Sequence, residues 1–314
     1  MMKPYPLLFN PVFKQRVWGG TRLKDWFREC SDTDQIGEAW ILSDHQEGKS
    51  TVSNGPYTGK TLSEVIEQEP DWFGPDMKEF PLLFKVIDAA KDLSVQVHPD
   101  DVYAYEHAGE RGKTECWWVL DAAQDAKIVY GHHAQTRQDF EQAEQADKWD
   151  DVLKYSAVSP GDFRFVPAGK VHALGAGTMV LEVQQSSDTT YRVYDYKRPG
   201  TDGKLRPLHL EDALNVIPFP DTDDSLVSHV SSGTSLASCP YFEVEKWEID
   251  GKEEVLANQV LVIAPTDNSA TLSFDSESLT LEKGHAVLLP KGVTVTLAGR
   301  FTGIVTKVPD SESK

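Results

Sequence analysis

The sequence has little cysteine and no long apolar run, and both shortages narrow the class of protein. Its 314 residues include 3 cysteines, Cys30, Cys116 and Cys239, without CxxC spacing. This argues against a disulfide framework or a thiolate zinc site and fits a reducing compartment. No stretch approaches the roughly 18 apolar residues of a membrane span, and the start lacks the charged region and apolar core of a signal peptide. We therefore expect a cytoplasmic protein with no membrane partner.

Basic residues are also in short supply. Lys and Arg total 31 against 50 Asp and Glu, which gives a formal net charge of −19. Such a charge opposes nonspecific binding to nucleic acid, so we expect no nucleic-acid partner, and an anionic substrate would need a locally basic pocket. The length suffices for two ordinary domains, or for one large domain with insertions.

The most informative stretch covers residues 161–172 and reads GDFRFVPAGKVH. Its glycines and its proline suit turns on either side of a short strand, because glycine accepts positive φ and proline fixes φ. On the strand that follows, Val171 and His172 are expected to point to opposite faces, since side chains alternate along a strand. Taken alone, a histidine of this kind is more often structural than a metal ligand.

The same spacing recurs downstream at residues 284–295, which read GHAVLLPKGVTV. The pattern G-x5-P-x-G is kept, but Val295 stands where the first copy has His172. With its histidine, the first copy resembles the second conserved motif of the cupin superfamily. The repeat therefore predicts a duplicated barrel in which only the first copy has a metal site.

Strand patterns upstream of this motif place polar side chains on shared faces. In SVQVH, Gln96 and His98 lie two residues apart and share one face. In KTECWWVL, Lys113 and Glu115 do the same. A carboxylate flanked by cysteine and tryptophans is unusual unless it is paired or bound to metal, although a solvated strand position is the simpler alternative.

Side chains from three predicted strands thus offer nitrogen and oxygen donors without a thiolate. Such a set suits Zn, Fe, Mn or Co more than a closed structural zinc site. The donors are Gln96, His98, Glu115 and His172.

Longer strings resemble the type I mannose-6-phosphate isomerases, the zinc-dependent cupin-fold phosphomannose isomerases. The matching strings, within residues 80–200, are FPLLFKVIDA, LSVQVHPDD, GKTECWWVL, VPAGKVHALG and VQQSSDTTYRVYD. The resemblance implies that Lys113 and Arg192 line the substrate pocket as catalytic or phosphate-facing cations. It also implies one zinc ion per chain, with these ligands: Gln96, His98, Glu115 and His172.

The implied reaction interconverts mannose 6-phosphate and fructose 6-phosphate through an enediol, with a small-molecule sugar phosphate as partner. It needs a base, an electrophile for the enediolate charge and a cation for the phosphate. The sequence does not rank the possible bases, which are a zinc-bound water and the side chains of Lys113, Asp188, Asp195 and Glu182. Only short acidic helices, at residues 136–154, separate the Glu115 and His172 segments, so the chain resembles the short bacterial form of the family.

The fold expected is mainly β, with two cupin-type (jelly-roll) barrels and a few short helices. Residues 1–220 would form the catalytic cupin domain and residues 239–310 a second, metal-free one, joined by a linker from Pro218 to about Cys239. We expect a monomer or a weak homodimer.

Several local expectations accompany this fold. Thr21 is a candidate cap for a short helix that extends through Arg28, and the Thr61 to Glu64 spacing predicts a capping box on a helix that ends at Pro70. A further short helix is expected at 206–217. Glu38 and His45 have the pattern of ordinary surface residues.

Two other functions fit a cupin with a metal site. An iron-dependent cupin dioxygenase usually has more histidine ligands, whereas Gln96 here replaces one imidazole by an amide. A noncatalytic sugar-binding cupin would keep zinc for structure alone. That role does not require Lys113 and Arg192 beside the metal ligands.

Overall fold

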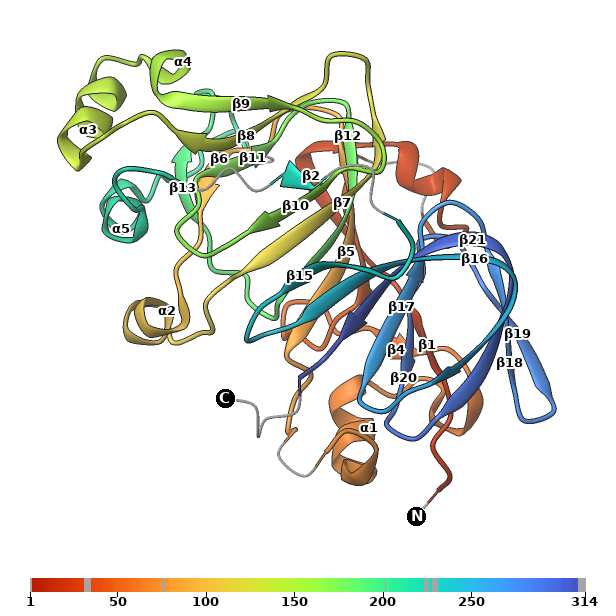
Figure 1. Cartoon of the computed structure of the whole chain (residues 1–314). Helices are drawn as coiled ribbons and strands as arrows, with labels where there is room; N and C mark the ends of the chain where they lie inside the picture. Colours follow the sequence, from red (N-terminus) through yellow and green to blue (C-terminus); the bar gives the residue numbers. More distant parts are fainter. Residues whose placement is uncertain are drawn as a thin grey trace.

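The structure, a computed structural model, describes residues 2–30, 35–74, 77–200, 202–222, 226–227 and 231–309. Three sheets, of seven, five and nine strands, make up most of the regular secondary structure, with a few short helices around them (Figure 1). The prediction of a mainly β protein is therefore confirmed. None of the helices in the described ranges has the length and apolar character that crossing a bilayer requires.

The seven-stranded sheet contains the central strands of the predicted catalytic domain. Neighbouring strands run antiparallel in the order β14-β10-β7-β12-β5-β2-β3, and β5 also pairs with β3. The strand bounds, in that order, are Leu226–Val227, Phe163–Val166, Glu115–Ala122, Thr178–Gln185, Leu82–Ala89, Val12–Gly20 and Ile36–Leu42.

The five-stranded sheet lies against it and has the order β13-β6-β11-β8-β9. Along the chain, the helices α2, α3 and α4 lie between its short strands, and α5 follows β13. The bounds are Tyr191–Tyr194, Val95–Val97, His172–Leu174, Lys127–His132 and Leu153–Ala157.

The nine-stranded sheet combines the C-terminal part of the chain with two N-terminal strands. Its path is β15-β16-β21-β17-β20-β1-β4, with the hairpin of β18 and β19 attached to β21. The strand β1 pairs with β20 through Leu7 and Leu288, so the start of the chain completes the C-terminal sheet (Figure 1). The bounds along the path are Thr234–Ser238, Glu243–Leu256, Thr294–Lys307, Leu261–Pro265, Val287–Leu289, Leu7–Asn10 and Thr51–Val52, then Ala270–Phe274 and Glu277–Leu281 for the hairpin.

The helices are short, and local signals explain where some of them begin. The predicted capping box at the start of α1 is confirmed, since Thr61 and Glu64 each accept the backbone N–H of the other. The predicted cap at Thr21 is wrong: its side chain makes no capping bond, and only a 3-10 turn, Arg22–Asp25, follows. The α-helices α1 to α5 span Leu62–Gln68, Asp101–His107, Arg137–Gln145, Trp149–Val152 and Leu210–Val216, and further 3-10 turns span Gly55–Tyr57 and Pro70–Trp72.

The seven-stranded sheet is buried on both faces. One face, which carries Trp117 and Val180, packs against Ile128 and Leu174 of the five-stranded sheet. This shared core encloses the candidate site. The opposite face, which carries Trp118, packs against the nine-stranded sheet, and the outer face of the five-stranded sheet is covered by α3, α4 and α5.

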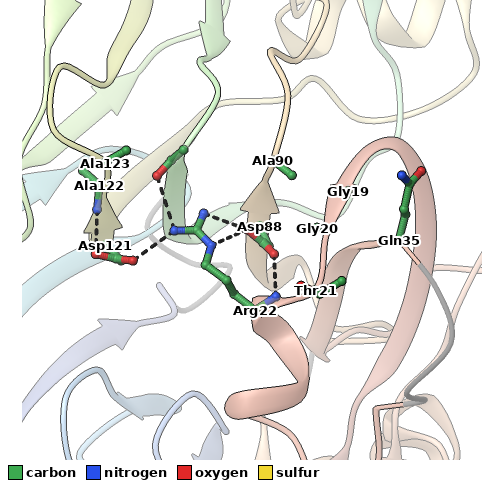
Figure 2. A pocket seen from close by; sticks show the side chains of 11 residues that line it. Gly19, Gly20, Thr21, Arg22, Gln35, Asp88, Ala90, Asp121, Ala122 and Ala123 are labelled. Carbon is green, nitrogen blue, oxygen red and sulfur yellow. Dashed lines mark hydrogen bonds and ion pairs between the residues drawn. The ribbon is translucent and has the colours of Figure 1, made fainter.

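Arg22 closes one end of the seven-stranded sheet. Its side chain donates to Asp88 at 2.7 Å, to Asp121 at 3.0 Å and to the carbonyls of Gly177 and Thr178 (Figure 2). These partners lie at the ends of β5, β7 and β12, and Asp88 is fully buried. Arg22 therefore links β5, β7 and β12 at one end of the sheet, whereas Glu115 lies at the opposite end of β7.

The predicted linker, Pro218 to Cys239, lies partly outside the described residues. Within the described part, residues 218–222 rest on the five-stranded sheet, and β15 begins the nine-stranded sheet. The domain division between residues 220 and 239 stays a prediction, and the pairing of β1 with β20 means that any such division is crossed by the first strand.

Candidate metal centre

His172 is positioned by the turn that precedes β11. Gly169 in this turn has a φ of 85°, a conformation that only glycine adopts without strain, and its N–H donates to the carbonyl of His98 at 2.8 Å. As predicted, Val171 packs in the apolar layer under the helices while His172 points to the opposite face. The turn therefore brings His172 and His98 together.

His98 follows β6, whose valines hold it against the outer core. Val95 and Val97 are fully buried among the residues under the helices, so Gln96 between them faces the inside of the site. In the sheet, Gln96 lies directly opposite His172 on one side and Arg192 on the other. Residues opposite each other in antiparallel strands share a face, so these three side chains form one row.

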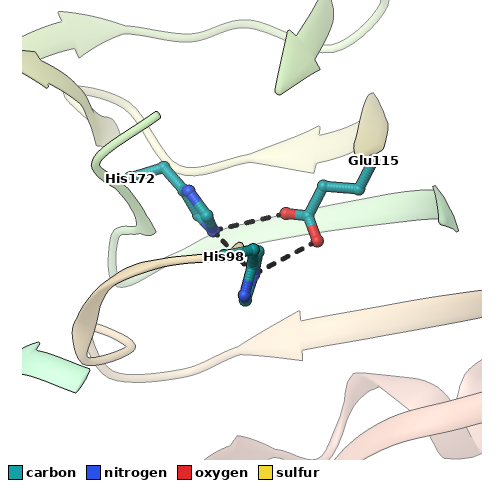
Figure 3. Close-up of side chains that lie close together, drawn as sticks. All are labelled: His98, Glu115 and His172. Carbon is teal, nitrogen blue, oxygen red and sulfur yellow. Dashed lines mark hydrogen bonds and ion pairs between the residues drawn. The ribbon is translucent and has the colours of Figure 1, made fainter. Parts of the chain in front are cut away.

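Glu115 enters from the seven-stranded sheet and meets the two histidines. Its carboxylate oxygens lie 3.4 Å from Nε2 of His98 and 3.4 Å from Nε2 of His172 (Figure 3). The two Nε2 atoms are themselves 3.2 Å apart. All three side chains are buried, and theirs is the one such group of at least three potential ligands that the described residues contain.

The backbone fixes which nitrogen of each imidazole carries its proton. Nδ1 of His172 lies 2.8 Å from the carbonyl of Lys170, and Nδ1 of His98 lies 3.0 Å from the carbonyl of Thr189. A carbonyl only accepts, so each Nδ1 must donate, and each neutral ring then presents the Nε2 lone pair to the other. Two lone pairs and a carboxylate at these distances repel one another unless a cation lies between them.

The electrostatics of the cluster lead to the same conclusion. Burial lowers the pKa of His172 to about 4 and lowers that of His98 well below its usual value, so both rings are neutral at physiological pH. Burial, together with the charge of Glu182, raises the pKa of Glu115. Both oxygens of this buried carboxylate lack a hydrogen-bond donor. Burying such a group without a partner destabilises the fold by about 1–3 kcal/mol, and by more when the group is charged, unless a ligand compensates it.

Gln96 and Lys113 complete the inner surface around the cluster. The amide nitrogen of Gln96 lies 3.3 Å from Nε2 of His172, and a rotation of the amide would present its oxygen at the same place. Nζ of Lys113 lies 3.6 Å from Glu115, and the lysine side chain is buried. The four side chains that the sequence predicted as ligands therefore converge, with Lys113 beside them.

Arg192 lies at the edge of the same row. Its Nη1 donates to the carbonyl of Pro207 at 2.8 Å, while its Nε is buried without a hydrogen-bond acceptor. Burial, assisted by the nearby Arg206, lowers the pKa of the guanidinium, which nevertheless stays charged. A half-buried guanidinium with a spare buried donor is suited to binding an anion that enters the site.

Comparisons with known proteins agree with this geometry. Residues 7–115 match the family model of the phosphomannose isomerase type I catalytic domain, and residues 232–308 match that of the mannose-6-phosphate isomerase cupin domain. The mannose-6-phosphate isomerase ManA of Bacillus subtilis (strain 168) is 43% identical over 93% of this chain and 95% of its own. The chain belongs to the type I phosphomannose isomerases.

Solved structures of phosphomannose isomerases have the same fold. The crystal structure of the mannose 6-phosphate isomerase from Bacillus subtilis superposes with a TM-score of 0.91, at 39% identity, over 96% of this chain and 99% of that one. A mannose 6-phosphate isomerase described as bound with zinc and yttrium superposes with a TM-score of 0.77 over 97% of this chain and 100% of its own. At 16% identity, the second comparison concerns the fold alone.

The sequence interpretation missed a buried polar network beside the candidate metal centre. Nζ of Lys85 lies 3.1 Å from Glu182 and donates to Gln184, and the indole of Trp117 donates to Glu182 at 2.9 Å. Burial opposes the charged form of Lys85, but the charges of Glu182 and Glu38 outweigh it and raise the pKa of Lys85. One signal was present: a single lysine inside the apolar run FPLLFKVIDA.

The interpretation of Glu38 and His45 as ordinary surface residues is wrong, because each is only 7% exposed. Glu38 receives Nε and Nη2 of Arg16, both at 3.0 Å, and the indole of Trp40 at 2.7 Å. Burial alone would raise the pKa of Glu38, but Lys85 and Arg16 lower it to about 2. Glu38 thus belongs to the same charged network as Lys85.

Proposed function

We propose that the chain is a zinc-dependent isomerase that interconverts mannose 6-phosphate and fructose 6-phosphate by enediol proton transfer. The observation that carries the proposal is the buried Glu115 carboxylate, without a hydrogen-bond donor, in contact with two imidazole lone pairs. This donor set fits a divalent cation, and its neighbours, Lys113 and Arg192, provide the positive charge that a sugar phosphate requires.

Zinc fits the donors that these residues offer. Nitrogen and oxygen atoms without a thiolate suit a catalytic zinc ion, which keeps a coordination position for water or substrate. When bound, the ion polarises the oxygens of the substrate at the reacting carbons. One ion per chain would be held by Gln96, His98, Glu115 and His172.

Arg192 and Lys113 bind and orient the substrate in this proposal. Arg192 presents its unoccupied Nε and a planar, permanently charged fork to the phosphate or to the enediolate. Lys113, buried and 3.6 Å from Glu115, places a second positive charge close to the reacting carbons. Together they offset the repulsion that a protein of net charge −19 exerts on a sugar phosphate.

The contacts of the possible bases narrow the choice. Asp195 is held by Arg198 at 2.9 Å and by Arg206, so its lone pairs are engaged. Asp188 is exposed, whereas Lys113 and Glu182 are buried beside the cluster, and Oε1 of Glu182 lies 3.1 Å from Nζ of Lys85. We assign the proton transfer between carbons 2 and 1 to Lys113 or Glu182, because a buried group near the substrate can hold the proton away from water.

The remaining parts of the proposal concern the whole chain. The C-terminal sheet would be a second cupin-type barrel without a metal site, residues 239–310, beside the catalytic cupin domain of residues 1–220. Val295, the counterpart of His172, is buried in an apolar core. The chain would act in the cytoplasm on a small sugar phosphate, as a monomer or weak homodimer.

A coupled assay of mannose 6-phosphate conversion tests the proposal. Activity should disappear on chelation and return when zinc, manganese or cobalt is added back. No conversion with any metal would overturn it. Exchange of the carbon 2 proton into solvent separates an isomerase from a noncatalytic sugar-binding cupin, and an oxygen-uptake assay separates it from an iron dioxygenase.

A further inference from the structure

The segment 216–221, which begins at the last residue of α5, fits closely against the turn that positions His172. A Cβ built on Gly169 would lie 2.9 Å from the carbonyl oxygen of Val216, and one built on Gly131 would lie 1.9 Å from Oδ2 of Asp221. Neither glycine could carry a side chain without displacing the segment. The segment therefore rests directly on the backbone of β8 and of the turn before β11.

An ion pair fixes this contact. Nζ of Lys170 donates to Oδ1 of Asp221 at 2.8 Å, and the two side chains are only 2% and 3% exposed. Oδ2 of the same carboxylate accepts the backbone N–H of His132 at 3.0 Å. Burial alone would raise the pKa of Asp221, but Lys170 lowers it, so the pair is charged.

Lys170 is also the residue that orients His172. Its carbonyl oxygen accepts the Nδ1 proton of His172 at 2.8 Å. Its Nζ lies 4.4 Å above the ring of Tyr130, and Tyr130 is the residue directly opposite His172 in the sheet. Lys170 is held at both ends, because its N–H donates to the carbonyl of Pro167 at 3.1 Å and its Nζ to Asp221, and the direction of its carbonyl determines the direction of the imidazole.

The second copy of the turn supports this link. Counting from the shared glycines and proline, the position of Lys170 is taken by Val293, which is buried in the apolar core of the C-terminal sheet. The copy with a histidine to orient has a buried cation before it. The copy without that histidine has an apolar side chain.

We propose that the ion pair of Lys170 and Asp221 positions His172 for metal binding, so that Asp221 is a positioning residue of the metal centre. No interaction described above joins Asp221 to any of the four ligands. In this proposal it acts through the Lys170 carbonyl. The inference rests on the proposed function, because it takes a divalent metal as the occupant of the cluster. Outer partners of metal-bound histidines typically contribute about 10- to 100-fold in metal affinity.

Competition for zinc against a chromophoric chelator tests the inference on the full chain. Asp221→Asn keeps the shape of the side chain but removes its charge, and it should weaken zinc binding by about 10- to 100-fold. At saturating zinc, the KM for mannose 6-phosphate should stay within about twofold of the wild-type value, since Asp221 is buried against Lys170 and His132 and acts in this proposal only through the metal ligand. The matched control is Asp147→Asn, which removes an ion pair with Lys197 of similar length, 2.7 Å. The side chains of Asp147 and Lys197 are 53% and 69% exposed, so the zinc affinity of this variant should be unchanged.

A second variant guards against misfolding, because Asp221→Asn leaves a buried lysine charge uncompensated. The double variant Lys170→Met with Asp221→Asn removes both charges at similar volume and keeps an oxygen that can accept the His132 N–H, so it should fold, and it should also lose at least about tenfold in zinc affinity. Zinc binding within twofold of wild type in either folded variant would overturn the positioning role. By contrast, failure of the wild-type chain to bind zinc, or undiminished binding by His172→Val, would overturn the proposed function itself.

Discussion

The two copies of the G-x5-P-x-G turn have the same backbone hydrogen bonds, but their side chains differ in chemical character. The glycines that begin them, Gly161 and Gly284, have φ values of 88° and 80° and donate to a neighbouring strand at 2.8 Å in both copies. The residue after the second glycine, Lys170 or Val293, donates back to the proline at 3.1 and 3.2 Å. The turn is therefore a structural device that both sheets use.

The side chains differ at every position that would hold a metal. Gly169 donates to the carbonyl of His98 in the first copy, whereas Gly292 donates to that of Ala257 in the second. Val166 pairs with Glu115, and its counterpart Leu289 pairs with Leu261. His98, Glu115 and His172 thus correspond to Ala257, Leu261 and Val295, all buried in one apolar core.

This comparison separates fold from chemistry. The glycines and the proline specify the turn in either copy, whereas the proposed chemistry depends on three side chains that converge only beside the first copy. The largest effect is therefore expected when the first copy is made like the second. The predictions below test the comparison in order of decreasing effect.

The variant His172→Val should abolish zinc binding and reduce activity by on the order of 10³-fold or more, since several kcal/mol of transition-state stabilisation is lost with the metal. The apolar Val295 shows that the turn itself tolerates valine, so the chain should still fold. Metal content per chain and the coupled assay measure the two effects. Retention of a tenth of the wild-type activity would contradict the assignment of His172.

The variant Arg192→Ala should separate catalysis from metal binding within the first copy. Removing one charged donor from a preorganised site typically costs on the order of 10²-fold in turnover. Arg192 lies opposite Gln96 and its Nη1 donates to the Pro207 carbonyl, and it is not among the proposed ligands, so zinc content should stay at one ion per chain. Near-normal turnover would show that Arg192 has only a structural role.

The reciprocal change, Val295→His, should not create a metal site, because Ala257 and Leu261 supply no ligand beside it. A polar ring buried there without partners should destabilise the chain by about 3 kcal/mol. Urea unfolding and zinc stoichiometry measure the outcome. A second bound zinc ion would mean that the turn alone suffices, contrary to the comparison.

The two cores also differ in charge, and Glu38→Gln tests this difference through pH. Glu38 has a folded pKa of about 2, below the unfolded value of about 4.3. Its contribution to the free energy of unfolding is therefore complete above pH ~4.3 and declines as the pH falls toward 2. The variant should lose about 2 kcal/mol at pH 7, and the difference from wild type should shrink below pH ~4.3.

Urea unfolding of both proteins at several pH values measures this difference. The control Glu141→Gln removes an exposed ion pair with Arg137 on α3 and should change stability little. A gap between wild type and Glu38→Gln that widens on acidification would have the wrong sign for a buried, charged Glu38.

Local sequence was sufficient for the turn, the capping box and the face to which His172 points. Glycine at positive φ, the Thr61 to Glu64 spacing and the alternation of Val171 with His172 are each decided by a few neighbouring residues. The ligand set also depended on the resemblance to known isomerases, because nothing local indicates that Glu115 meets two histidines from another sheet.

The rest depended on contacts between distant parts of the chain. Lys85 meets Gln184 across 99 residues, and Lys170 meets Asp221 across 51, so neither pair has a local pattern. Glu38 was taken as exposed because alternation gives the face of a strand and not what covers it. For the same reason the pairing of β1 with β20 could not be foreseen.

The central claim is that the first turn, and not the second, holds a metal. Anomalous diffraction at the zinc absorption edge, from crystals of the zinc-loaded chain, tests this most directly. We predict one peak per chain, between Nε2 of His98, Nε2 of His172 and the carboxylate of Glu115. The absence of that peak, or a peak beside Val295, would contradict the account.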